Sequence, residues 1–254
     1  MTTIAILFWA GVFLVFYTYL GYGILLWTLV KIREALRPAR RYEVPAEAPE
    51  VTLLIAAYNE QEIVAEKMAN CRALEYPASK LRITWITDGS TDRTVELLAA
   101  YPDATVLHDA RRGGKTAALN RALEHIRTPL VVFTDANTML NLEAVTEIVR
   151  CFEDPQVGCV AGEKRVADAG GAGAAATEGV YWKYESKLKE LDYRLYSAVG
   201  AAGELFAVRR GLWQTLPEDT LLDDFVCSML IASQGYKIAY CKAVSYTHLT
   251  LPTK

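Results

Sequence analysis

VTLLIAAYNEQEIVAEKMANCRAL, residues 51–74, and LRITWITDGSTDRTVELLAA, residues 81–100, decide the fold class of this chain. Each stretch opens with a short apolar run, typical of a buried strand, and continues with the spacing of an amphipathic helix. The same alternation continues through residues 105–152. A β-α-β-α order of this kind predicts an α/β fold, with a mostly parallel sheet and helices on both faces.

The apolar runs predict strands at residues 51–57, 81–87, 105–107, 130–134, 157–161, 205–208 and 236–240. The amphipathic stretches predict helices at residues 60–74, 92–100, 115–126, 142–152, 177–196 and 223–233. Residues 167–176 are almost all glycine and alanine, so they predict a mobile loop. In a parallel sheet of this class, ligands bind beyond the carboxyl ends of the strands.

Composition narrows the class of protein. The chain has 254 residues, of which 52% are apolar and 22% are charged, which favours a packed core over disorder. The net charge of −3 gives no indication of a nucleic-acid binder. None of the five cysteines has a metal-ligand spacing, so we expect buried, reduced thiols.

The N-terminal segment has the composition of a membrane span. Residues 4–30 carry no charge, and as a helix they would be about 40 Å long, more than the roughly 30 Å hydrocarbon core of a bilayer. A cleaved signal peptide is the alternative, but the basic n-region is missing. Five basic residues follow the apolar run, and by the positive-inside rule they place the rest of the chain in the cytosol: Lys31, Arg33, Arg37, Arg40 and Arg41.

The chain therefore divides into segments with different compositions. Residues 1–36 are predicted to be a single transmembrane helix with its basic flank, in the cell (inner) membrane. Residues 37–50 contain three prolines and predict an extended linker. Residues 51–243 carry the α/β pattern and are predicted to be the catalytic domain.

Two acids follow predicted strands. Asp88 comes after the second strand and Asp135 after the fourth, so both are expected at one edge of the sheet. The alternative is that such an acid only caps the next helix. Asp135 and Asn137 are hard oxygen donors two residues apart, which suits Mg²⁺ or Mn²⁺ bridging a diphosphate.

A glycine-rich segment, residues 111–116, leads into the third predicted helix. It ends in Gly-Lys-Thr, like a P-loop, but Asp109 occupies the position at which that motif needs a glycine. We interpret Gly113 and Gly114 as a tight turn, with Lys115 offering a point charge to a phosphate.

A pair of acids opens the last predicted helix. Asp223 and Asp224 stand beside apolar residues. One alternative is helix capping and the other is a general base, in which one carboxylate is positioned and the other has a raised pKa.

Together, these segments resemble family 2 glycosyltransferases with the GT-A fold, in particular the membrane-bound cellulose-synthase-like and poly-sugar-synthase-like members. The resemblance covers residues 51–243. The matching motifs occur in the family's order: Ala57-Tyr58-Asn59-Glu60, Asp88-Gly89-Ser90-Thr91-Asp92, Gly114-Lys115, Asp135-Ala136-Asn137, Gly203-Glu204-Leu205-Phe206-Ala207-Val208-Arg209-Arg210 and Asp223-Asp224-Phe225.

The resemblance implies roles for these positions. The residues implied to bind the donor nucleotide, usually UDP, are Ala57, Tyr58, Glu60, Asp88, Lys115 and Asp135. Asp135 would be the first acid of the family's metal-binding DxD motif, with Asn137 in place of the second. Asp224, beside Asp223, would deprotonate the acceptor hydroxyl for inverting attack. The acceptor side would include Gly203, Glu204 and Arg209.

The resemblance also predicts that the chain is incomplete. The family's Gln-x-x-Arg-Trp segment and C-terminal membrane helices do not appear in it. Residues 244–253 match one translated frame of a transposase adapter used in DNA library preparation, so residues 244–254 are interpreted as non-native. The polypeptide as written is therefore expected to be inactive or nearly so.

The predicted function is transfer of a sugar from a UDP-sugar to a glycan or lipid acceptor, in the synthesis of cell-envelope or extracellular polysaccharide. A nucleotidyltransferase acting on a sugar phosphate is one alternative, although it would have no use for Asp224. The other is a non-catalytic, membrane-anchored protein that binds nucleotide sugars.

Overall fold

The computed structural model describes residues 2–38, 42–164, 174–201 and 203–248. The basic residues Arg40 and Arg41 lie outside the described residues, as does most of the glycine- and alanine-rich stretch at residues 167–176.

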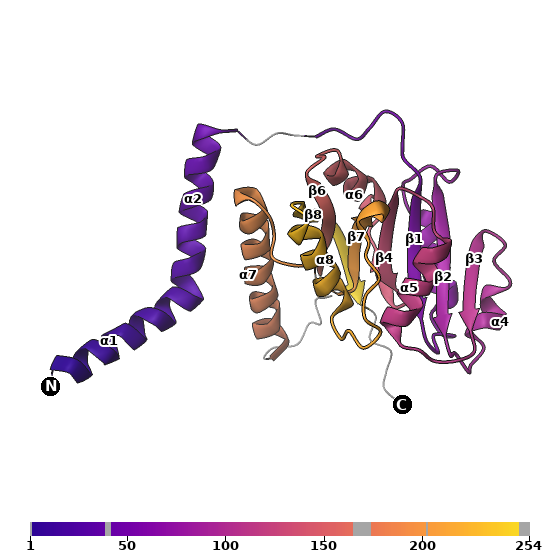
Figure 1. Ribbon diagram of the computed structural model, residues 1–254, viewed down its shortest axis with the longest axis horizontal. Coiled ribbons are helices and arrows are strands. Elements are labelled where there is room, and N and C mark those ends of the chain that lie inside the picture. Colours follow the sequence, from indigo (N-terminus) through magenta and orange to yellow (C-terminus); the bar gives the residue numbers. More distant parts are fainter. Residues whose placement is uncertain (1, 39–41, 165–173, 202, 249–254) are drawn as a thin grey trace.

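A single sheet forms the centre of the α/β part of the chain (Figure 1). In the described residues it has eight strands, in the order β3-β2-β1-β4-β7-β6-β8-β5. The strands are β1 Val51–Ala57, β2 Leu81–Asp88, β3 Ala104–Asp109, β4 Leu130–Asp135, β5 Thr138–Leu140, β6 Val157–Lys164, β7 Leu205–Arg209 and β8 Lys237–His248.

Strand direction divides the sheet into two parts. Strands β3, β2, β1 and β4 are all parallel, as the sequence predicts. Strand β7 runs antiparallel to both β4 and β6, and β5 runs antiparallel to β8, whereas β6 and β8 are parallel. The sheet as a whole is therefore mixed, and its parallel half comes from the N-terminal strands.

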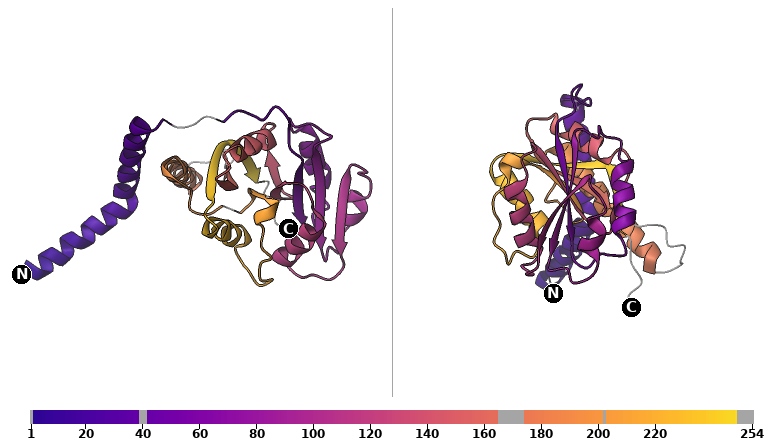
Figure 2. Two further views of the ribbon diagram at one scale, coloured as in Figure 1. Left: turned by 45° about the horizontal axis from the view of Figure 1, so that its top comes forward. Right: turned by 90° about the vertical axis from the view of Figure 1, so that its right-hand side faces the viewer.

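Helices cover both faces of the sheet (Figure 2). On one face lie α3 Val64–Ala73, α4 Thr94–Leu98 and α6 Ala144–Phe152. The other face is covered by α5 Lys115–His125 and α8 Asp223–Ser233. Alternate residues of each strand point to opposite faces, so Leu53 of β1 joins the first core and Leu54 the second.

The N-terminal segment forms a long, bent helix outside the sheet. It comprises α1 Thr2–Phe16, the π-helical turn η1 Tyr17–Gly21 and α2 Tyr22–Leu36. Within the described residues, this stretch alone is long and apolar enough to cross a membrane, a test that a signal sequence also meets. Helix α7 Ala174–Leu195 lies between α2 and β8 (Figure 1).

The structure departs from the predicted elements in a few places. The three-residue strand β5 and the 3-10 turn η2 Arg210–Leu212 were not expected, because each is too short to show a period. Strand β8 continues to His248, and Val244 and Tyr246 are buried in it. The proposed adapter origin of residues 244–254 stays a prediction, because the packing of a segment does not show where its coding sequence came from.

Candidate active site

Strand register brings the predicted donor residues to one edge of the sheet. Ala57 ends β1 beside Thr87 of β2, and Ala56 of β1 pairs with Asp135 of β4. Because these strands are parallel, Asp88, which ends β2, lies at the same edge. The predicted edge of strand-end acids is thus present.

Lys115 and Asp135 form the central ion pair of this edge. The Nζ of Lys115 lies 2.7 Å from Oδ1 of Asp135. Burial alone lowers the pKa of Lys115, but the charges of Asp135, Asp223 and Asp224 outweigh it and raise that pKa above its ordinary value. The ammonium therefore stays protonated among carboxylates that come from two distant parts of the chain.

Asp88 shapes the glycine turn before Lys115. Its Oδ2 accepts hydrogen bonds from the backbone N–H groups of Gly113 at 2.9 Å and Gly114 at 2.7 Å. Gly114 has a φ of 94°, a conformation that favours glycine. The guanidinium of Arg121 lies 3.6 Å from Oδ1 of Asp88. The carboxylate is buried and fixes the start of α5, in addition to the nucleotide-binding role implied by the resemblance.

Tyr58 and Glu60 follow β1 at the same edge. The Arg112 guanidinium stacks over the Tyr58 ring, 3.9 Å from its centroid, so the glycine turn and the end of β1 are in contact. Burial raises the pKa of Glu60, and the charges of Asp135 and Asp92 raise it further. Both residues lie just after the end of β1, and their roles in donor binding stay predictions.

Asp223 and Asp224 open α8, and both are buried. The backbone N–H of Gly203 donates a hydrogen bond to Oδ2 of Asp224, which fixes that carboxylate. Among the described residues, Oδ2 of Asp223 has no hydrogen-bond partner. Burial raises the pKa of Asp223, Lys115 opposes the shift and Asp224 adds to it. One carboxyl is thus positioned and its neighbour is protonated more readily.

The residues of this edge suit a hard divalent cation in combination with a diphosphate. Asp135 and Asn137 supply oxygen donors of the kind that Mg²⁺ and Mn²⁺ prefer. No group of three His, Cys, Asp or Glu side chains able to hold a metal exists within the described ranges. A cation held by these two protein oxygens would need most of its remaining ligands from diphosphate oxygens and water.

A buried lysine that sequence reasoning missed supports the turn carrying Asp135 and Asn137. Lys67 of α3 is fully buried. Its Nζ donates hydrogen bonds to Oγ1 of Thr134, at 3.1 Å, and to the carbonyl oxygen of Thr138. Burial lowers its pKa to about 8. The ammonium thus ties together both ends of this turn; in the sequence, a lone lysine in a helix looks like a surface residue.

Strand β7 brings part of the predicted acceptor side to the same edge. Because β7 is antiparallel to β4, Leu205 pairs with Thr134, and Gly203 and Glu204 lie just before it. The Nζ of Lys164 is 2.8 Å from Oε1 of Glu204. A cavity of about 150 Å³ beside this pair is lined by Gly162, Lys164, Trp182, Glu185, Ser186, Lys189, Gly203, Glu204, Tyr240 and Tyr246.

Arg209 does not belong to this site, which corrects the sequence-based prediction. It pairs with Leu130, the first residue of β4, so it lies at the opposite end of the sheet. Its guanidinium donates hydrogen bonds to the carbonyl oxygens of Val157, Phe152 and Asp154. The antiparallel direction of β7 puts the start and the end of this motif at opposite edges.

The GT-A class of glycosyltransferases has a parallel N-terminal half-sheet, with acids at the strand ends and a carboxylate nearby, and this chain shows the same arrangement. Solved structures support the assignment to this fold. A mannosyltransferase from Pyrobaculum calidifontis, in complex with GDP-Man and Mn²⁺, is similar with a TM-score of 0.74 and 25% identity, over 93% of this chain and 67% of that one. TarS from S. aureus in complex with UDP-GlcNAc has the same fold, with a TM-score of 0.62 and 16% identity, over 81% and 60% of the two chains.

The chain belongs to the glycosyltransferase-like family 2, whose model matches residues 48–253. It is 29% identical over 201 residues to a beta-monoglucosyldiacylglycerol synthase of Nostoc sp. (strain PCC 7120). It is 27% identical over 201 residues to a poly-beta-1,6-N-acetyl-D-glucosamine synthase of Staphylococcus aureus (strain COL). These matches cover 72% and 75% of this chain, but 41% and 47% of the two relatives, so the chain spans less than half the length of either.

Proposed function

We propose that this chain is the donor-binding and catalytic part of an inverting glycosyltransferase that uses a UDP-sugar. The acceptor is a glycan or a membrane lipid, and the product belongs to the cell envelope. The catalytic domain acts on the cytosolic side of the membrane, anchored by the N-terminal helix. The two curated relatives support the acceptor classes, because one is named for a glycolipid and the other for a polysaccharide.

One observation carries the proposal: Lys115 and Asp135 pair at 2.7 Å at the sheet edge, within the electrostatic reach of Asp223 and Asp224. Gly203, whose backbone amide holds Asp224, lines a small void of about 10 Å³ together with Lys115 and Asp135. The charged pair suited to a diphosphate and the candidate general base are therefore near one another.

Different residues bind the donor and activate the acceptor in the proposed reaction. The Lys115 ammonium binds the diphosphate of the donor and stabilises its charge as it leaves. Asp135 and Asn137 would hold a divalent cation, which neutralises the same charge when bound. Asp224, held by the Gly203 amide, accepts the proton of the acceptor hydroxyl. The acceptor oxygen forms its bond to the anomeric carbon while the carbon–oxygen bond to the diphosphate breaks, which inverts the configuration.

The test combines donor binding and product analysis. Calorimetry on this chain compares UDP with GDP in the presence of Mn²⁺. Products are then identified by mass spectrometry, with UDP-sugars and GDP-mannose as donors, for this chain and for the product of its resequenced gene. Saturable UDP binding and a glycosylated product support the proposal. Release of pyrophosphate from a nucleoside triphosphate and a sugar phosphate, or binding without any turnover by the resequenced gene product, would overturn it.

A further inference from the structure

Helix α2 is attached to the catalytic domain through α7. Leu26 and Val30 of α2 form a buried apolar cluster with Leu191 of α7. A β-carbon added at Gly23 would lie 3.1 Å from Oη of Tyr184 and 3.3 Å from Leu188, so the glycine lets the two helices approach closely. The contact between α2 and α7 is therefore close, and its central apolar side chains are buried.

Polar contacts link α7 to both ends of α2, and we call this α2–α7 contact the joint. At one end, the Tyr22 hydroxyl donates to Oδ1 of Asp192 at 2.7 Å. At the other end, Nη2 and Nε of Arg194 donate to Oε1 of Glu34, at 2.5 Å and 3.0 Å. Arg194 also lies 3.4 Å from Glu190 of α7.

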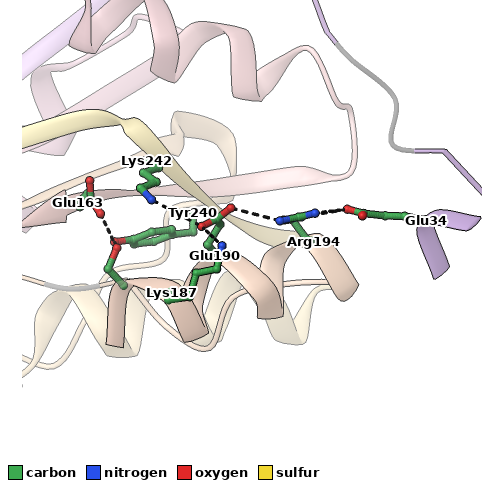
Figure 3. A network of polar contacts seen from close by, with 8 residues as sticks. Glu34, Glu163, Lys187, Glu190, Arg194, Tyr240 and Lys242 are labelled. Carbon is green, nitrogen blue, oxygen red and sulfur yellow. Dashed lines mark hydrogen bonds and ion pairs between the residues drawn. The ribbon is translucent and has the colours of Figure 1, made fainter. Parts of the chain in front are cut away.

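The charges continue from the joint into the catalytic domain. Glu190 is paired with Lys187 at 3.0 Å and with Lys242 of β8 at 3.8 Å. Figure 3 shows this row of charged side chains running from Glu34 through Arg194 to Glu190 and Lys242. Charged groups cost several kcal/mol each, on the order of 3, in the middle of a bilayer. The hydrocarbon core therefore has to end before the level of Asp192 in α7, which Tyr22, the first residue of α2, contacts.

The remaining length matches a bilayer. Helix α1 (15 residues) and η1 (5 residues) together extend about 30 Å, the thickness of a hydrocarbon core. They carry no charged residue, and their large apolar side chains are exposed. At the inner end, the Tyr184 hydroxyl of α7 donates to the Tyr19 carbonyl oxygen at 2.6 Å. Tyrosines of this kind are typical of the membrane–water interface.

We propose that the hydrocarbon core of the bilayer ends at Gly21 and Tyr22. In this arrangement α1 and η1 cross the core, whereas α2 lies outside it and packs against α7. The span is shorter than residues 4–30, the range without charges. The partner of the α1 surface is the acyl-chain region of a bilayer. This inference rests on the proposed membrane attachment, but not on the proposed chemistry.

Two native tryptophans report on the boundary. With a core at residues 2–21, Trp9 lies about 4 Å from the bilayer centre and Trp27 lies at or beyond its edge, about 15 Å or more away. With a core at residues 4–30, the two lie at similar depths, about 12 and 15 Å. Both indole rings are half exposed or more, at 66% and 52%.

The experiment measures fluorescence quenching in lipid nanodiscs whose acyl chains carry bromine near the bilayer centre. The signal of each tryptophan is the difference between the parent chain and Trp9→Phe or Trp27→Phe. We expect loss of most of the Trp9 signal and little of the Trp27 signal. Equal quenching of both would overturn the proposed boundary and leave the glycosyltransferase proposal intact. No quenching of Trp9 would overturn membrane attachment as well.

A matched pair of glycine variants tests the joint itself. Gly23→Leu places a side chain against Tyr184 and Leu188, whereas Gly11→Leu in α1 has open space around its β-carbon. We expect faster amide hydrogen exchange in α7 for Gly23→Leu and no change for Gly11→Leu. Exchange in the central strands serves as the folding control. Unchanged amide exchange of α7 in Gly23→Leu would contradict the proposed packing of α2 against α7.

Discussion

The Nζ of Lys115 lies 2.7 Å from Oδ1 of Asp135, and this pair joins the glycine turn that opens α5 to the end of β4. Asp88 holds that turn in place through two backbone amides. The charge of Lys115 is also balanced by Asp223 and Asp224 of α8. One ammonium group thus connects the predicted diphosphate site to the predicted general base.

We expect Asp224→Asn to bind UDP-sugar like the parent but to transfer sugar roughly 10²–10⁴ times more slowly, the usual cost of removing a general base. The asparagine keeps an oxygen for the Gly203 amide and loses the ability to take a proton. Transfer rates are measured on the product of the resequenced gene, with Asp219→Asn as a surface control. Parental rates in Asp224→Asn would assign the base to another carboxylate, and Asp223 is the first to test.

Gly89→Ala is expected to destabilise the fold by at least about 1 kcal/mol and to weaken donor binding. Gly89 has a φ of 70°, and a β-carbon there would lie 2.7 Å from Cβ of Arg112, next to the stacked Tyr58. The control is Gly211→Ala, where a β-carbon meets nothing within 4 Å. Urea unfolding gives the free energies, and equal values for both variants would refute the steric argument.

The buried Lys67 should make stability depend on pH. Its pKa is about 8 in the folded chain, below the ordinary 10.5, so above pH 8 the unfolded state binds a proton that the folded state has released. The free energy of unfolding should therefore rise with pH between about 8 and 10.5, by on the order of 3 kcal/mol. Lys67→Met removes this increment, whereas the more exposed Lys80→Met keeps it. Identical pH profiles for the parent and Lys67→Met would show that the pKa is not lowered.

The orientation of the chain can be tested with a reporter. We expect a fusion after Arg41 to report a cytosolic location, because five basic residues lie between residues 31 and 41. A reporter fused before Thr2 is the complementary measurement, because the proposed topology places that end of the span on the opposite side of the membrane. A reporter that is active outside the cytosol after Arg41 would reverse the topology.

The sequence predicted the parallel half of the sheet best. Strand β1 has the predicted bounds, since an apolar run followed by an amphipathic helix is the strongest periodic signal in an α/β chain. The positions of Asp88 and Asp135 followed from the rule for parallel strands. Figure 2 shows the helices on both faces that the alternation requires.

Other features depend on information that a single sequence does not carry. Arg209 was misplaced because strand direction is decided by tertiary pairing, and β7 runs antiparallel to β4. The burial of Lys67 could not be predicted because it depends on contacts with Thr134 and Thr138, which lie 67 and 71 residues further along the chain. Hydropathy also does not distinguish Leu26 packed on α7 from a leucine facing lipid.

The central claim is that the sheet edge around Asp135 binds a nucleotide diphosphate together with a divalent cation. The most direct measurement is calorimetry of UDP binding with and without Mn²⁺, for the parent chain, Asp135→Ala and the surface control Asp103→Ala. We expect Mn²⁺-dependent binding in the parent and in Asp103→Ala, and none in Asp135→Ala, because in the proposed site Asp135 would supply the charged oxygen ligand, and it is the ion-pair partner of Lys115. Unchanged, Mn²⁺-dependent UDP binding in Asp135→Ala would contradict the assignment of the site.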